Sequence, residues 1–197
     1  MPILAAEPDL YPATLLETPP ATSGVWFVAM TRPRQEKSLA RDLFSAGIAF
    51  FSPCTPRRNL VRGRIVISRI PLFAGYVFIR GLGPDRARVL LTNRVLQLLT
   101  VPDPERLEAD LRQVWCLTGT GRPLMPAERL DVGTPVQIRE GPMAGLKGRV
   151  IRTSGMKRFV VAVDFLGSGV AVELEAETLA RLPVARSRPE LSAGALR

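Results

Sequence analysis

An uninterrupted apolar stretch, residues 71–79 (PLFAGYVFI), constrains the fold of this chain more than any other feature. Alternate side chains of a strand point to opposite faces of a sheet, so Tyr76 and Phe78 share one face while Val77 and Ile79 share the other. Both faces are apolar and need cover. The chain's own helices can supply that cover, or another protein can supply it on one side.

The residue types that most catalytic and metal sites need are missing. The chain has no histidine, and Cys54 and Cys116 lie far apart in the sequence, which disfavours a zinc site. Without histidine, the usual activation of a serine or cysteine nucleophile is absent, and the carboxylates lie beside arginines instead of in apolar pairs. We therefore expect no enzyme activity, no metal and no cofactor.

The charge of the chain favours an anionic partner. The 197 residues carry a formal net charge of +9, and arginine pairs well with phosphate. The alternative is that this charge only keeps the surface soluble. The N-terminus does not resemble a secretion signal, and no apolar run is long enough to span a membrane. We expect a cytoplasmic monomer without membrane contact.

The order of apolar patterns predicts an α+β domain followed by a small all-β domain. Strands are expected at 25–30, 48–53, 64–70 and 95–101 as well as in the apolar run, with helices before Gly47 and at 84–93 and 104–117. Residues 57–63 are expected to form a turn or hairpin tip. The predicted division is a disordered tail at 1–24, a domain at 25–117, a linker at 118–129, a second domain at 130–183 and a disordered tail at 184–197.

The second domain contains a glycine-punctuated motif at residues 131–150, DVGTPVQIREGPMAGLKGRV. Its spacing resembles the KOW motif of ribosomal proteins and transcription factors. Short strands are expected at 135–139, 148–153, 159–165 and 170–175, in an SH3-like barrel. Each glycine can equally serve only to shape a corner of the sheet.

Residues 25–183 then resemble the NusG family of transcription elongation factors. The resemblance is carried by Trp26-Phe27-Val28, the basic segment after it, the run from Pro71 to Phe78, and the order of linker and KOW motif. The segments 34–37 and 61–63 are more similar to the specialised RfaH-type members. The resemblance implies an antiparallel sheet with flanking helices, then the barrel, and a factor that suppresses pausing or termination without catalysis.

The resemblance also implies a docking site for the clamp helices of RNA polymerase. The positions that correspond to it are Phe73 and Tyr76, with Phe78 as a further wall and Trp26 or Phe27 beside it. Each of these aromatic residues can instead belong to the chain's own core.

Five arginines precede the apolar run: Arg57, Arg58, Arg62, Arg64 and Arg69. On a hairpin they would bind phosphates without reading sequence. The family places this region near upstream DNA and the non-template strand. The alternative is a solvated face.

Two segments depart from the family pattern. Thr92-Asn93-Arg94 lacks the histidine with which RfaH contacts the polymerase gate loop. Phe165-Leu166-Gly167-Ser168 stands where NusG presents a Phe-Gly-Arg loop, so Phe165 and Leu166 are the expected partner-binding residues. The missing arginine makes Rho a less suitable partner than ribosomal protein S10.

Two further alternatives remain open from the sequence. The second domain of RfaH can refold into helices, but the β-prone segment 159–165 predicts that the barrel persists here. The alternative function is a ribosome-associated or RNA-binding KOW protein.

Overall fold

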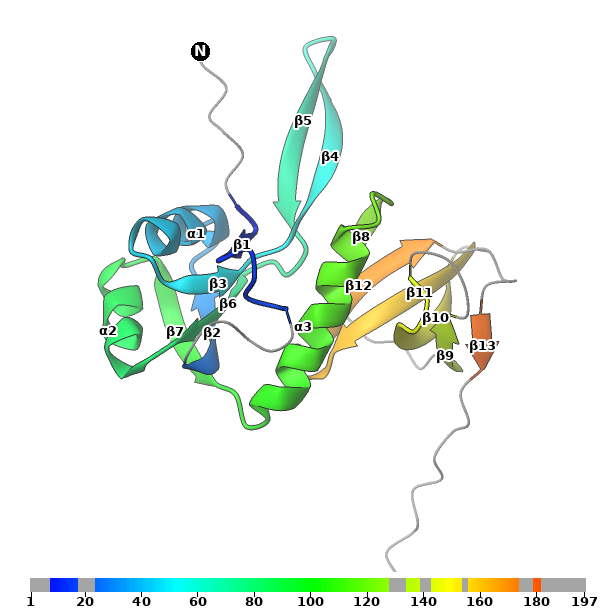
Figure 1. Cartoon of the computed structure of the whole chain (residues 1–197). Coiled ribbons are helices and arrows are strands. Elements are labelled where there is room, and N and C mark those ends of the chain that lie inside the picture. Colours follow the sequence, from blue (N-terminus) through cyan, green and yellow to red (C-terminus); the bar gives the residue numbers. More distant parts are fainter. Residues whose placement is uncertain are drawn as a thin grey trace, which may run out of the picture.

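The computed structural model describes residues 8–17, 24–127, 134–138, 143–153, 156–173 and 179–181. These residues form an α+β fold of antiparallel sheets and three α-helices, as predicted. Helix α3 (Pro104–Thr118) lies between the two larger sheets and contacts β2 (Val25–Thr31) and β11 (Met156–Val163), as Figure 1 shows. Among the described helices, none has the length and apolar character needed to cross a membrane.

The first sheet has five strands. Their order is β1 (Leu10–Tyr11), β3 (Ala49–Phe51), β6 (Tyr76–Gly81), β2 and β7 (Val95–Thr100). Helices α1 (Glu36–Ser45) and α2 (Gly83–Leu91) cover one face. Val77 and Ile79 are fully buried there with Leu39 and Leu43 of α1, which confirms that this side of the apolar run meets the chain's own helices.

The opposite face of the first sheet is also covered from within the chain. Trp26, Val28 and Phe78 are buried on this side, in one cluster with residues of α3. The apolar positions of α3 recur at helical spacing and are buried, namely Leu107, Leu111, Val114 and Leu117. Both faces of the apolar run therefore have intramolecular cover.

The N-terminal segment adds to that cover, so the prediction of a disordered tail over residues 1–24 is wrong for residues 8–17. Strand β1 pairs with β3, while Leu15 and Leu16 are buried in the same cluster as α3. The segment has no periodicity because it forms only a two-residue strand and a turn. Its order comes from tertiary contacts that no local pattern reveals.

Strands β4 (Cys54–Val61) and β5 (Arg64–Pro71) form a separate hairpin that projects from the first sheet (Figure 1). The turn consists of Arg62 and Gly63 alone, with φ of 49° and 75°. Positive φ at both positions is typical of type I′ turns, whose twist matches that of the flanking strands. The predicted turn over 57–63 was therefore too long, because the polar residues before Arg62 pair with β5.

The second sheet has six strands in an open order. This order is β13 (Leu179–Arg181), β9 (Thr134–Ile138), β10 (Lys147–Thr153), β11, β12 (Ser168–Glu173) and β8 (Leu124–Ala127). The predicted strands are confirmed, and β8 comes from the segment predicted as linker. Within the described residues the sheet does not close, so the SH3-like barrel is not confirmed. The predicted C-terminal tail, 184–197, lies outside the described residues.

Candidate functional site

The aromatic residues predicted to bind a partner separate into two groups. Trp26, Phe73 and Phe78 are buried in one cluster, and the rings of Phe73 and Phe78 pack edge to face with centroids 5.2 Å apart. Phe27 is buried on the other side of the sheet, where the Arg86 guanidinium lies 4.9 Å from its ring centroid. These four rings have partners within the chain and do not form an open depression.

Tyr76 is the partly exposed member of the predicted aromatic set in the N-terminal half. It begins β6 directly after a tight turn, in which its N–H donates to the carbonyl of Phe73 at 3.1 Å. Gly75 has a φ of 82° and donates its N–H to the buried carboxylate of Glu36 at 2.7 Å. The Gly75 carbonyl accepts from the N–H of Thr31 at 2.8 Å. These bonds fix the backbone that presents Tyr76.

A polar contact that the sequence did not predict fixes α3 against the sheet. The Glu108 carboxylate accepts hydrogen bonds from the Trp26 indole N–H and from Arg80, each at 2.9 Å, and it also pairs with Arg112. The Arg80 and Glu108 side chains are only 12% and 13% exposed. The spacing of Glu108 and Arg112, four residues apart on a helix, was the only local signal.

The five predicted phosphate-binding arginines do not form one cluster. Directly paired residues of antiparallel strands share a face, so the register places Arg58 and Arg69 on one face of the hairpin and Arg57 and Arg64 on the other, with Arg62 in the turn. Arg69 forms an ion pair with Asp9. The cations best placed for a shared phosphate backbone are therefore Arg57, Arg62 and Arg64.

The base of the hairpin holds the half-buried thiol of Cys54. Asp9 accepts from the backbone N–H of Cys54 at 3.3 Å and pairs with Arg69. Burial, helped by the Asp9 carboxylate, raises the pKa of Cys54 to about 12. Burial also raises the pKa of Asp9, against the opposing charge of Arg69. Within the part of the chain that is described, no three His, Cys, Asp or Glu side chains gather as a metal site.

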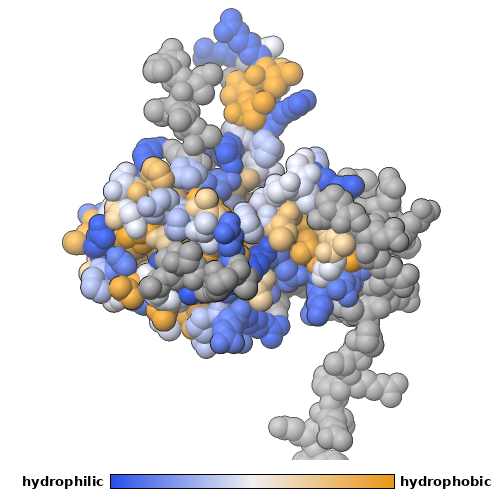
Figure 2. All heavy atoms as spheres, in the orientation of Figure 1, coloured by the Kyte–Doolittle hydropathy of each residue, from blue (hydrophilic) through white to orange (hydrophobic). Residues whose placement is uncertain are grey.

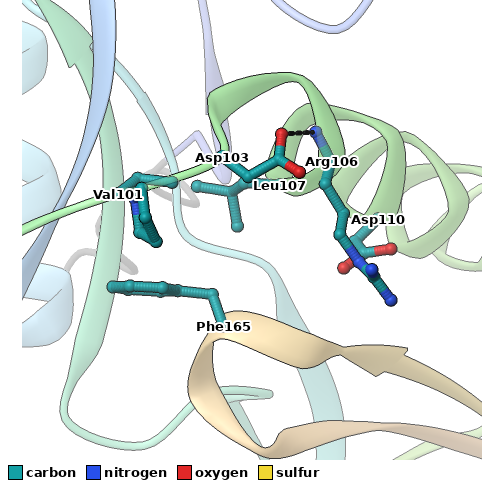
Figure 3. A pocket seen from close by; sticks show the side chains of 7 residues that line it. Val101, Asp103, Arg106, Leu107, Asp110 and Phe165 are labelled. Carbon is teal, nitrogen blue, oxygen red and sulfur yellow. Dashed lines mark hydrogen bonds between the residues drawn. The ribbon is translucent and has the colours of Figure 1, made fainter. Parts of the chain in front are cut away.

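The predicted partner-binding loop of the second domain packs against the first. Phe165, in the short 3₁₀ helix η1 (Asp164–Leu166), lines a pocket of about 330 Å³ with Val101 and Leu107 (Figure 3). Asp103 caps α3 at this pocket by accepting the N–H of Arg106 at 3.0 Å. A hydrogen bond joins the domains, from the N–H of Lys147 to the Gln113 side-chain oxygen at 2.8 Å. Leu166 also packs against the shared core.

Comparison with known protein families gives a match within the first domain of the chain. The NusG family, described as transcription termination factor nusG, matches residues 24–111, which run from the start of β2 into α3. The matched range contains the apolar run, Tyr76 and the whole hairpin. Comparison with curated proteins returned no match. Over residues 24–111, the chain is therefore similar to the NusG family of transcription factors.

Proposed function

We propose that this protein is an elongation or antitermination factor that binds the clamp helices of RNA polymerase through its first domain. The family match over residues 24–111, which includes the fixed and partly exposed Tyr76, supports this proposal most strongly. Such binding stabilises the active polymerase in proportion to its preference for that state, so pausing and termination decrease without catalysis by the factor itself.

Tyr76 is the residue expected to contribute most to polymerase binding. A hot spot is usually an aromatic side chain on a rigid, well-packed support. The buried rings of Phe73 and Phe78 form such a support, and Glu36 and Thr31 fix the turn before Tyr76. A side chain held in this way loses little conformational entropy when the partner arrives.

The test is the affinity of the full chain for core RNA polymerase. Tyr76→Ala is expected to weaken binding by more than about 1 kcal/mol, or roughly fivefold, as for a hot-spot residue. Phe44→Ala is the matched control, because Phe44 is a 47% exposed aromatic residue on α1. Equal affinities of Tyr76→Ala, Phe44→Ala and the unmodified chain would count against the proposed docking site.

The hairpin is proposed to contact upstream or non-template DNA through Arg57, Arg62 and Arg64. These contacts would add salt-dependent affinity without sequence preference. The alternative function, a ribosome-associated or RNA-binding protein, predicts tight binding to free RNA with a steep salt dependence. Tight binding to core polymerase combined with weak binding to free RNA would favour the transcription factor.

The second domain is proposed to recruit a further protein, such as ribosomal protein S10, through Phe165 and Leu166. Both residues pack against the core shared with α3, so recruitment would require their release from this contact. The cytoplasmic location and the RfaH-like character remain part of the proposal.

A further inference from the structure

One face of the hairpin exposes aliphatic side chains framed by arginines. The pairing of β4 with β5 places the side chains of Leu60, Ile65 and Ile67 on the same face. These residues are 75%, 69% and 62% exposed to solvent. Arg58 and Arg69 flank them on that face. Figure 2 shows apolar atoms on the projecting hairpin between hydrophilic side chains. So large an exposed aliphatic surface on a thin two-stranded ribbon is unusual unless something binds it.

The same face continues into a groove at the base of the hairpin. The groove, of about 880 Å³, is lined on one side by Pro56, Arg58, Ile67 and Arg69. The turn between α3 and β8 supplies the other side, including Arg122 and Leu124. Asp9 also lines the groove, where it pairs with Arg69. Beyond this ion pair, aliphatic and cationic groups occur together from the groove to Leu60 near the tip.

From this composition we infer that the aliphatic face is a docking surface for an extended, acidic and aliphatic segment of a partner protein. The arginines on this face are Arg58 and Arg69, of which Arg69 pairs with Asp9, so the carboxylates of a partner complement Arg58. Aliphatic side chains of the partner would lie on Leu60, Ile65 and Ile67 while its carboxylates pair with Arg58.

The observations favour a protein over the other anionic partners. Single-stranded nucleic acid gains affinity by stacking bases on aromatic rings, and residues 54–71 contain no aromatic residue. A membrane surface would favour apolar residues at the tip, whereas the tip here is Arg62-Gly63-Arg64. The inference is independent of the proposed DNA contact, which uses the opposite face and the turn.

The chain's own ends are poorer occupants on charge. Residues 182–197 contain three arginines and one glutamate, and residues 1–7 contain Glu7 as their only charged side chain. Neither segment combines carboxylates with aliphatic side chains as this face requires: residues 1–7 have one acidic residue and residues 182–197 are mainly cationic. A partner protein is the occupant that matches both the charge and the aliphatic surface.

The probe is a fluorescein-labelled decapeptide of alternating valine and glutamate, titrated into the full chain. The double variant Ile65→Thr/Ile67→Thr removes aliphatic surface from this face while keeping β-branched residues in the strand. We expect its affinity for the peptide to fall about tenfold or more, as for loss of central interface residues. Val66→Thr is the matched control, because Val66 lies on the same strand and is 45% exposed, but faces the other way.

Three further measurements separate the possible occupants. An oligonucleotide of ten thymidines should bind the unmodified chain and the double variant equally, and so should vesicles of phosphatidylglycerol, since both are attracted by the net charge of +9 and not by the aliphatic face. The inference is overturned if the peptide does not bind, or if Val66→Thr weakens peptide binding as much as the double variant does. It is also overturned if binding of the oligonucleotide or of the vesicles depends on Ile65 and Ile67. It is also overturned if removal of residues 1–7 raises peptide affinity tenfold, since the chain's own N-terminus would then be the occupant.

Discussion

The indole N–H of Trp26 on β2 donates a 2.9 Å hydrogen bond to the Glu108 carboxylate on α3, across 82 residues of sequence. Arg80 on β6 donates to the same carboxylate oxygen, and its guanidinium lies 5.8 Å from the centre of the Trp26 ring. One carboxylate thus joins α3 to two central strands of the sheet. Because α3 also supports the second domain, this contact stabilises the whole arrangement.

Replacing Glu108 should therefore destabilise the protein. Glu108→Ala leaves the Trp26 indole without its acceptor and Arg80 without its carboxylate, with the Gly24 carbonyl as the remaining acceptor for Arg80. In this mostly buried site the change is expected to cost about 2–3 kcal/mol of unfolding free energy. Glu108→Gln keeps an acceptor for the indole and should cost less. Urea denaturation measures both, and equal stability of Glu108→Ala and the unmodified chain would contradict this role.

Gly148 should not tolerate a side chain. A Cβ at this position would lie 2.4 Å from the Val160 carbonyl oxygen and 2.8 Å from the Phe159 ring. Gly148→Ala is expected to cost about 1–3 kcal/mol, because the paired strands β10 and β11 would have to separate. Gly83→Ala on α2 is the control, since nothing lies within 4 Å of its Cβ position. Thermal unfolding of the two variants should differ clearly.

The alternation of apolar residues predicted the core of the first domain well. Val77 and Ile79 meet α1 and α2, and the spacing of Leu107, Leu111 and Val114 placed α3 correctly. Such patterns report directly which side of an element is buried. They do not report what covers it, so the sequence left the cover over Phe73 and Phe78 open, and the structure supplies it from Leu15, Leu16 and α3.

Features that depend on distant contacts were not predictable. Strand β8 is short and lies in a Gly/Pro-rich segment, and it is ordered by pairing with β12. The Trp26–Glu108 bond joins residues that share no local pattern. The predicted arginine cluster was a cluster in sequence only, because strand alternation sends Arg57 and Arg58 to opposite faces. For the proposed site, the sequence predicted Tyr76 and Phe165 as binding residues but did not predict what surrounds them.

The two cysteines should differ strongly in reactivity. The thiolate is the reactive form, and raising the pKa of Cys54 from 9.0 to about 12 lowers its thiolate fraction at pH 8 about a thousandfold. Cys116 is exposed on α3. Alkylation with iodoacetamide at pH 8, followed by peptide mass spectrometry, should modify Cys116 first and Cys54 only after unfolding. Equal rates in the folded protein would contradict the raised pKa of the half-buried Cys54.

Arg62 should destabilise the hairpin turn while contributing to nucleic-acid binding. Its φ of 49° suits asparagine better than arginine, so Arg62→Asn is expected to stabilise the hairpin by about 0.5–1 kcal/mol. The lost charge should reduce the salt dependence of single-stranded DNA binding by about one ion. Arg57→Asn is the control: it removes a charge from the strand and should reduce the salt dependence, but it should not stabilise the hairpin. Amide hydrogen exchange of β4 and β5 measures the stability of the hairpin. Faster exchange in Arg62→Asn than in the unmodified chain would contradict the expected stabilisation.

Phe165 should hold the second domain against α3. Its ring lines the pocket formed by Val101, Leu107 and the start of α3, as Figure 3 shows. Phe165→Ala removes this ring from the contact between the domains, which α3 with β11 and the Lys147–Gln113 bond would then maintain. The expected results are faster amide exchange across α3 and a larger radius of gyration by small-angle X-ray scattering. Phe44→Ala on α1 is the control and should change neither measurement. If Phe165→Ala is as compact and as well protected from exchange as Phe44→Ala, then other contacts hold the two domains together.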